Sequence, residues 1–301
     1  MKVFLTGGTG FVGTHVLTRL LRDGHSVRAL LHSRTINDTG KPAADMLEKV
    51  HGDICSANLA DAMTGCDAVI NLVGIIYEHR RQTFDAAHHQ GTRNLVQAAR
   101  QCGVRRFIQM SALGARPKDA SAYHTSKFAA EEEVRNSGIP FVVLRPSLIV
   151  GRGSAFLQQM IGVMRAAPLV RPVPGTGQYR FRPVDVGDVA ECFVQSLTNS
   201  AATGQTIDLV GGEELTLDEL GDVIASHVGV HKRVVHIPMA LMKTAAAVFS
   251  MLPIRPPVTG VQLRMLQQGS TADPGPMKRI FGIEPIGFRA GIQYYLSSQS
   301  N

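Results

Sequence analysis

The stretch TGGTGFVG at residues 6–13 decides the fold of this chain. It lies between strand-forming residues at 1–5 and a segment, residues 11–22, whose apolar side chains recur at helical spacing. Strand, glycine-rich turn and helix therefore follow one another in the order that a dinucleotide-binding loop requires. Glycine permits the tight turn, the approach of backbone to a pyrophosphate, and close packing of helix on sheet. We expect the cofactor to be bound by the loop residues Gly7, Gly8, Thr9, Gly10, Phe11, Val12 and Gly13.

Downstream of the loop, strand-like apolar runs alternate with helical patterns, which is typical of parallel strands joined by crossover helices. The pattern predicts a doubly wound parallel α/β sheet of Rossmann type, followed by a smaller, mostly helical C-terminal substrate lobe. The predicted strands cover 26–31, 48–52, 68–73, 106–111 and 140–145, and the predicted helices cover 83–101 and 121–137. We assign residues 1–150 to the dinucleotide-binding domain. Residues 187–210 return to this domain through a helix capped by Asp188 and a strand at 206–210. Residues 151–186 and 211–301 form the lobe.

Composition narrows the functional classes. With 301 residues, of which 44% are hydrophobic, the chain is long enough to bury one large core and a smaller lobe. The net charge of +7 is scattered, without an aromatic-interleaved basic patch, so we expect no nucleic-acid partner. The four cysteines show neither paired nor metal-ligand spacing, which indicates reduced thiols and no metal site. With no confident transmembrane stretch and no room for a signal peptide before the first strand, a cytoplasmic location is expected.

Tyr123 and Lys127 are the candidates for acid/base chemistry. They are spaced Tyr-x-x-x-Lys within a predicted helix, so one helical turn separates them and both side chains project from the same face. Lys127 can hydrogen-bond a nicotinamide ribose, and its charge favours the phenolate form of Tyr123. Tyr123 can then donate a proton to a carbonyl oxygen as hydride arrives, or accept one in the reverse direction. On composition alone, coincidence is the alternative explanation of this spacing.

Further motifs extend over most of the chain. They are GDI at 52–54, NLVG at 71–74, GTRNL at 91–95, Glu131 beyond the Tyr123 and Lys127 pair, LRPS at 144–147 with Gly151, and VDVGDVA at 184–190. With the glycine loop, they make the sequence resemble the short-chain dehydrogenase/reductase superfamily, and within it the extended and atypical members. RFRPVDVGDVA at 180–190 and the Pro-rich helical tail make it similar, more narrowly, to the epimerase/dehydratase-like group of the NADPH-binding accessory subunit of respiratory complex I.

The resemblance implies cofactor contacts at the ends of several strands. These are Asp53 and Ile54 at the adenine, Asn71, Val73 and Gly74 under the adenosine ribose, and Arg145, Pro146 and Ser147 beside the nicotinamide. Each position also has a purely structural explanation, since Asp53 can cap a helix and Pro146 can simply end a strand.

Cofactor choice depends on the residues after the second strand. An acidic residue there would bind the ribose hydroxyls of NAD and repel a 2′-phosphate. This chain has none, and offers His32 and Arg34 instead, with Arg28 within the strand. We therefore expect NADP(H) to be favoured over NAD(H). The alternative is that Arg34 is a solvated loop charge; His32 stands where atypical members often carry Arg.

Two departures from the family pattern bear on turnover. The strand position at which the full catalytic tetrad carries Ser or Thr holds Ala112, with Ser111 one residue early. The position that is often Asn in the extended enzymes holds His88. Ser111 is the candidate catalytic hydroxyl, with Ser121 as an alternative, although a strand residue shifted by one faces the opposite side.

Three functions remain open. The first is an NADP-dependent oxidoreductase that acts on a carbonyl or hydroxyl of a small, partly apolar or quinone-like substrate. The second is a non-catalytic NADPH-binding accessory or assembly protein of a respiratory or quinone system. The third is a nucleoside-diphosphate-sugar epimerase or dehydratase, which the missing acidic ribose ligand disfavours. The sequence identifies neither the substrate nor the oligomeric state.

An apolar stretch at residues 237–252 (IPMALMKTAAAVFSML) bears on the partners. One interpretation is a helix packed over the substrate cleft. The other is a partly exposed apolar surface that touches a membrane interface or an acyl or prenyl substrate.

Overall fold

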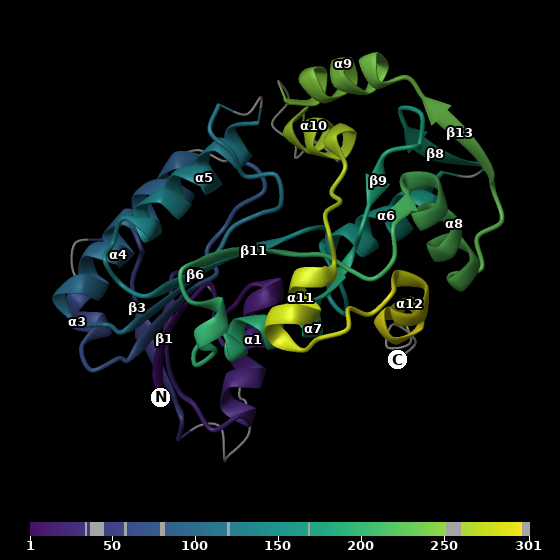
Figure 1. Cartoon of the computed structure of the whole chain (residues 1–301). Coiled ribbons are helices and arrows are strands. Elements are labelled where there is room, and N and C mark those ends of the chain that lie inside the picture. Colours follow the sequence, from purple (N-terminus) through teal and green to yellow (C-terminus); the bar gives the residue numbers. More distant parts are fainter. Residues whose placement is uncertain are drawn as a thin grey trace. The chain divides into compact units, whose positions relative to one another are not determined.

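The computed structural model describes residues 1–33, 35–36, 45–56, 59–78, 82–118, 121–167, 169–250 and 260–296 (Figure 1). The chain forms two compact units, each with its own core. The first unit comprises Met1–Pro146, Val186–Leu209 and Gly275–Ile283. The second comprises Ser147–Asp185, Val210–Pro274 and Glu284–Asn301.

A parallel sheet with strand order β11-β6-β5-β4-β1-β2-β3 organises the first unit. Its strands are β1 (Lys2–Thr6), β2 (Ser26–Leu31), β3 (Leu47–His51), β4 (Ala68–Asn71), β5 (Arg106–Met110), β6 (Phe141–Pro146) and β11 (Gln205–Leu209). The chain runs outward from β1 to β3, then returns to β4 on the other side of β1. The strand order therefore reverses between β1 and β4, the place where open parallel sheets bind ligands.

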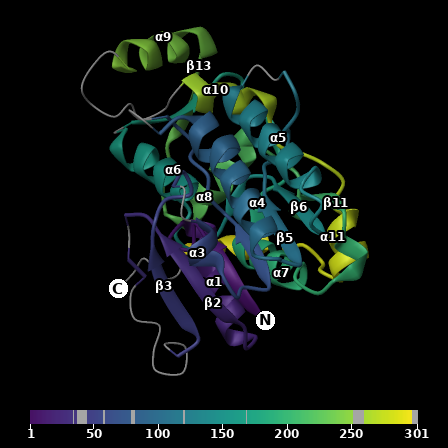
Figure 2. The same cartoon turned by 90° about the vertical axis from the view of Figure 1, so that its left-hand side faces the viewer.

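Helices cover both faces of this sheet (Figures 1 and 2). They are α1 (Phe11–Arg22), α3 (Leu59–Met63), the π-helical turn η1 (Asp85–Gln90), α4 (Gly91–Gln101), α5 (Ala122–Arg135), α7 (Val186–Gln195), the short 3-10 turn η2 (Ser200–Ala202) and α11 (Gly275–Phe281). On one face α4 packs between α3 and α5, and on the other α1 packs against α7. Both faces are thus buried, which explains the almost uninterrupted apolar character of the central strands.

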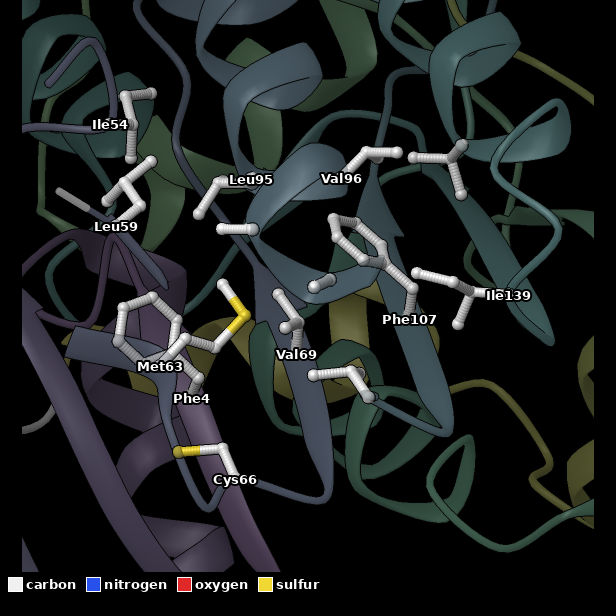
Figure 3. Close-up of a cluster of buried hydrophobic side chains, with 14 of the residues drawn as sticks. Phe4, Ile54, Leu59, Met63, Cys66, Val69, Leu95, Val96, Phe107 and Ile139 are labelled. Atoms are coloured by element: carbon white, nitrogen blue, oxygen red, sulfur yellow. The ribbon is translucent and has the colours of Figure 1, made fainter. Parts of the chain in front are cut away.

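The core beneath α4 is shown in Figure 3. Phe4, Val69 and Phe107 come from the neighbouring strands β1, β4 and β5, and all three are fully buried. They meet Leu95 and Val96 of α4, whose apolar positions recur at helical spacing.

The second unit is built from short strand pairs and helices. Its strands are β7 (Ile149–Val150), β8 (Val170–Pro174), β9 (Arg180–Phe181), β10 (Val184–Asp185), β12 (Leu215–Thr216) and β13 (Arg233–Ile237), and its helices are α6 (Ala155–Ala166), α8 (Leu217–His227), α9 (Met239–Ser250), α10 (Gly260–Gln268) and α12 (Phe288–Leu296). A capping box between Thr216 and Glu219 starts α8. Its core joins α6, α8 and α12 through Ile161, Leu220 and Phe288.

The predicted doubly wound parallel α/β sheet with a C-terminal helical region is confirmed. Each predicted strand is present, with ends that differ by no more than two residues. Asp188 is not an N-cap, because α7 already begins at Val186 and Asp188 lies inside its first turn. Gly275–Ile283 clusters with the first unit, although the sequence analysis placed it in the lobe, because α11 packs against β11 and α7.

A buried amide network ties three strands together where they end. Asn71, at the end of β4, accepts a hydrogen bond from Thr6 Oγ1 of β1 at 2.7 Å. Its Nδ2 donates to Gln109 Oε1 of β5 at 2.9 Å and to Thr92 Oγ1 of α4 at 3.1 Å. Its Oδ1 also accepts from the Val73 amide at 3.2 Å, which sets the first turn of the chain after β4.

We predict that Asn71→Leu destabilises the protein by about 2 to 4 kcal/mol, because it leaves the buried polar groups of its partners without hydrogen bonds. Urea unfolding of the cofactor-free protein measures this loss. The matched control is Gln97→Leu, which changes an exposed amide on α4 and should leave the unfolding midpoint unchanged. Equal midpoints for wild type and Asn71→Leu would contradict a stabilising role for the network.

Candidate functional site

The glycine loop has a shape that only glycine allows at two positions. Gly7 has φ +73°, and a Cβ on it would lie 2.8 Å from the carbonyl carbon of Leu72. A Cβ on Gly13 would lie 2.0 Å from the carbonyl oxygen of Gly7. The Gly10 amide donates to the same oxygen at 3.0 Å and closes the turn before α1. The loop therefore lies against the chain after β4 and brings the start of α1 to the point where the strand order reverses.

The other loop residues are packed to different degrees. Gly8 and Val12 are buried, whereas Thr9, Gly10 and Phe11 are half-buried. Gly10 is the N-cap of α1 and provides no side-chain cap, so backbone amides alone form the helix N-terminus. Such an end attracts an anion.

Lys127 is buried at the ends of β4 and β5. Its side chain is 1% exposed, and its Nζ donates to the carbonyl oxygens of Val73 at 3.2 Å and Met110 at 3.3 Å. A Cβ on Gly74 would lie 2.9 Å from this Nζ. Burial lowers the pKa of Lys127 to about 8, and the negative charge of Glu131, one turn further along α5, opposes that shift. The structure thus places the cation of the predicted pair beside the predicted ribose-binding loop.

Tyr123 lies one turn before Lys127, in an aromatic surrounding. Its ring meets Phe84, His88 and His124 edge-on, at centroid distances of 5.8, 5.5 and 5.3 Å. Burial raises the pKa of Tyr123 to about 12. The sequence analysis expected the charge of Lys127 to favour the phenolate. In this structure desolvation dominates and favours the protonated phenol, while the Lys127 ammonium bonds backbone carbonyls.

His88 holds three elements of the site together. Its Nε2 accepts from the Ile75 amide at 3.0 Å, and its Nδ1 lies 2.8 Å from Ser126 Oγ, which itself donates to the Tyr123 carbonyl. These partners assign the neutral tautomer with its proton on Nδ1. Burial, and secondarily the charge of Lys127, lowers the pKa of His88 to about 2. His88 also lies in a π-helical turn, a rare form that is frequent at functional sites.

Ser111 and Arg145 belong to a buried ionic cluster around Glu131. Glu131 has no exposed surface, and Arg145 binds it through two hydrogen bonds of 2.7 Å. Arg135 donates to the same carboxylate at 2.6 Å, and Ser111 Oγ donates to it at 2.5 Å. The predicted catalytic hydroxyl and the predicted nicotinamide-flanking guanidinium are therefore engaged with Glu131. The shift of one strand position away from Ala112 explains the direction of Ser111.

At the ends of β2 and β3, His32 and Asp53 face each other. His32 Nε2 lies 3.3 Å from Asp53 Oδ2, and both side chains are exposed to about half of their surface. Asp53 Oδ1 accepts from the Cys55 amide at 2.9 Å, so Asp53 also caps a local turn. Ile54 is buried and packs against Gly91 at the start of α4. Arg34 lies outside the described residues.

The remaining predicted residues end β6. The Pro146 carbonyl accepts from the Leu113 amide at 2.9 Å within the first unit. Ser147 belongs to the second unit, where its Oγ donates to the Arg182 carbonyl at 2.5 Å.

The sequence analysis missed the bonding roles of Gln109, Thr92 and Arg135 and the buried state of Glu131. A signal for the last was available, because Glu131 follows Lys127 by four residues and thus shares its helix face. Over the described ranges, no group of His, Cys, Asp and Glu residues could hold a metal ion. In the same part of the chain, no helix is long and apolar enough to cross a membrane.

Residues 3–210 match the model of the NAD dependent epimerase/dehydratase family. The chain belongs to this family. A nicotinamide dinucleotide is therefore the cofactor expected from the family. The glycine loop agrees with this expectation, because Gly7 and Gly13 have no Cβ and their backbone lies close to the point where the strand order reverses.

Distant relatives of this chain carry names that describe different functions. The "NADH dehydrogenase (ubiquinone) 1 alpha subcomplex subunit 9, mitochondrial" of Arabidopsis thaliana is 30% identical over 80% of this chain, which spans 61% of that relative's length. The "Ceramide reductase" of Caulobacter vibrioides is 27% identical over 86% of this chain and 81% of its own. The solved structure "MoeE5 in complex with UDP-glucuronic acid and NAD" is 21% identical, covers 99% of this chain and 98% of its own, and has a TM-score of 0.76. That last likeness shows the shared fold.

Two loop glycines should separate folding from cofactor binding in this chain. Gly13→Ala should lower the free energy of unfolding by about 2 kcal/mol or more, because the new Cβ would clash with the Gly7 carbonyl oxygen. For Gly10→Ala the nearest atom is the Gly7 oxygen at 3.3 Å, so we expect a loss below about 1 kcal/mol. Dinucleotide titration should nevertheless show weakened binding for Gly10→Ala and little or none for Gly10→Val. Wild-type affinity in Gly10→Val would remove the phosphate-loop assignment.

Proposed function

We propose that this protein is an NADP(H)-dependent oxidoreductase that transfers hydride to or from a carbonyl or hydroxyl group, with Tyr123 and Lys127 as its catalytic residues. The observation that carries this proposal is the buried Lys127 ammonium at the ends of β4 and β5, one turn from Tyr123. Lys127 Nζ bonds Val73, which lies beside the glycine loop. Acid/base group, cation and phosphate loop thus meet at the carboxyl edge of one sheet.

The proposed cofactor contacts follow from this edge. The pyrophosphate would lie on the amides of the glycine loop at the start of α1. Asp53 and Ile54 would bound the adenine, residues 71–74 the adenosine ribose, and residues 145–147 the nicotinamide. Because the Arg145 guanidinium is held by Glu131, its part would be carried by backbone rather than by its charge.

The hydride at the substrate carbon would come from, or pass to, the nicotinamide C4 of a bound dinucleotide, where the matching C–H bond would break or form. In reduction, Tyr123 Oη gives its proton to the carbonyl oxygen, so that one C–H and one O–H bond form and the phenolate remains. Lys127 stabilises that phenolate by its charge, and bulk solvent returns the proton. In the reverse direction, the same phenolate removes the hydroxyl proton. A Tyr123 that rests in its protonated form suits the reductive direction.

A partly apolar substrate fits this surrounding best. The Tyr123 ring is enclosed by Phe84 and other aromatic rings, which favours apolar contact near the reacting carbon. The relative named ceramide reductase supports a reduction on such a substrate. A nucleoside-diphosphate-sugar epimerase remains the least supported function, because it requires tightly held NAD and no acidic residue directly follows β2 at residues 32–36.

One observation favours a second candidate function. Ala112 has no hydroxyl, and that of Ser111 is bound to Glu131, so neither residue directly after β5 has a free hydroxyl to orient a carbonyl in the described structure. The chain would then be a cytoplasmic, membrane-peripheral accessory or assembly protein that binds NADPH without turnover. The relatives named as subunits of NADH dehydrogenase support this alternative.

Tyr123→Phe separates these two functions. The variant keeps the aromatic ring and deletes the proton donor, so we expect unchanged NADPH binding and at least about a 100-fold loss of turnover. The assay follows NADPH absorbance across a panel of carbonyl compounds and quinones. Lys127→Met should impair both binding and turnover, because Lys127 serves ribose and phenol alike.

Two results decide between the functions. Activity that persists unchanged in Tyr123→Phe would overturn the catalytic assignment. Tight NADPH binding by wild type, with no turnover across the whole panel, would favour the accessory protein.

The relative affinities for NADPH and NADH test the proposed role of the charged residues that follow β2. Arg34→Ala should weaken NADPH by about 1 to 3 kcal/mol and leave NADH nearly unchanged, since only NADPH carries the 2′-phosphate. His32→Ala should act in the same direction. Asp53→Asn should strengthen NADPH binding, because it removes a carboxylate from beside His32. Equal losses for both cofactors in Arg34→Ala would show that Arg34 has a structural role.

A further inference from the structure

A long segment of the second unit carries only positive charge. Residues 223–272 contain five Lys and Arg residues and no Asp or Glu, although the whole chain has 24 acidic residues. We call residues 223–272 the basic segment. Of the acidic residues just before it, Asp222 binds the buried Arg171, and Asp218 binds His236 of the segment itself. By sequence, the segment carries a formal net charge of +5.

The same segment exposes apolar side chains on its described part. Leu241 of α9 is 61% exposed and Val235 of β13 is 41% exposed. Arg233 and Lys243, which lie within two residues of them in sequence, are exposed as well. Figure 1 shows α9 at the outer edge of its unit, beyond α10, the helix against which it packs. Arg264 on α10 adds a further exposed cation.

These exposures favour the second interpretation of the apolar stretch, that of a partly exposed apolar surface. On α9, Leu241 and Lys243 are both open to solvent, while Ala246 is buried. A helix of 12 residues is about 18 Å long, too short for the roughly 30 Å hydrocarbon core of a bilayer. Such a helix can lie in the interface but cannot span the membrane.

We propose that helix α9 and strand β13 of the basic segment form a docking surface for an anionic lipid membrane. Leu241 and Val235 enter the boundary between headgroups and acyl chains, while Arg233 and Lys243 remain at the level of the phosphates. The absence of acidic residues over the segment is what separates this surface from an ordinary solvated one. Charge brings the surface to the membrane, and shallow apolar insertion holds it there.

Vesicle sedimentation of the full chain tests this surface. Wild type should bind vesicles with about 30% phosphatidylglycerol and not pure phosphatidylcholine, and about 0.5 M NaCl should release it. Lys243→Glu should weaken partitioning at least about fivefold, with Lys243→Gln between the two. Leu241→Ser should weaken it about tenfold, because a buried apolar side chain is lost.

Matched controls place the effect on the segment. Arg100→Glu reverses an exposed charge on α4 of the first unit, and Tyr294→Ser removes an exposed apolar side chain on α12, away from α9 in Figure 1. Both should bind vesicles as wild type does, and all variants should keep the wild-type thermal midpoint. Absence of binding at low salt, equal binding to neutral vesicles, or equal losses in the controls would overturn the proposal.

Discussion

The close approach of the glycine loop to the chain after β4 is the constraint on which the site depends. Gly7 leaves no space for a Cβ against Leu72, and Gly13 leaves none against Gly7 itself. Asn71 supports this contact, because it binds Thr6 of β1 and Gln109 of β5 at once and accepts from the Val73 amide in the turn that follows β4. The glycine loop, the chain after β4 and Lys127 are therefore held by one buried arrangement of contacts.

The buried charges of α5 divide into two sets with different physical roles. Glu131 is surrounded by two arginines and a serine hydroxyl, which satisfy its carboxylate and make it a structural joint between α5 and β6. Lys127 has only neutral carbonyls as hydrogen-bond partners in the described structure, and burial lowers its pKa. A ligand that offers hydroxyl acceptors would supply what Lys127 lacks. An incompletely compensated cation at the edge of a sheet is thus more informative about function than a fully paired one.

The fold could be predicted from the sequence because buried parallel strands are recognised by continuous apolar runs. The spacing of Gly7 and Gly13 is also compatible with few backbone conformations other than a dinucleotide-binding loop. The sequence was sufficient to place Tyr123 and Lys127 on one helix face, since that depends only on local geometry. It could not show that Ser111 is bound by Glu131, because that contact joins a strand to a helix twenty residues away. Nor could it give the direction of the Tyr123 pKa, which depends on rings brought together by the tertiary fold.

The proposed function places cofactor binding and turnover on separable parts of this molecule. The glycine loop, the chain after β4 and Lys127 are sterically fixed to one another, so they persist as long as the protein folds. Ala112, at the position where the resemblance implies a catalytic hydroxyl, is buried just after β5, and an alanine is easily accommodated there. A residue at this position can therefore change without altering the glycine loop or Lys127. What distinguishes an enzyme from a binding protein here is the position of a few atoms around Tyr123, while the sheet beneath is common to both.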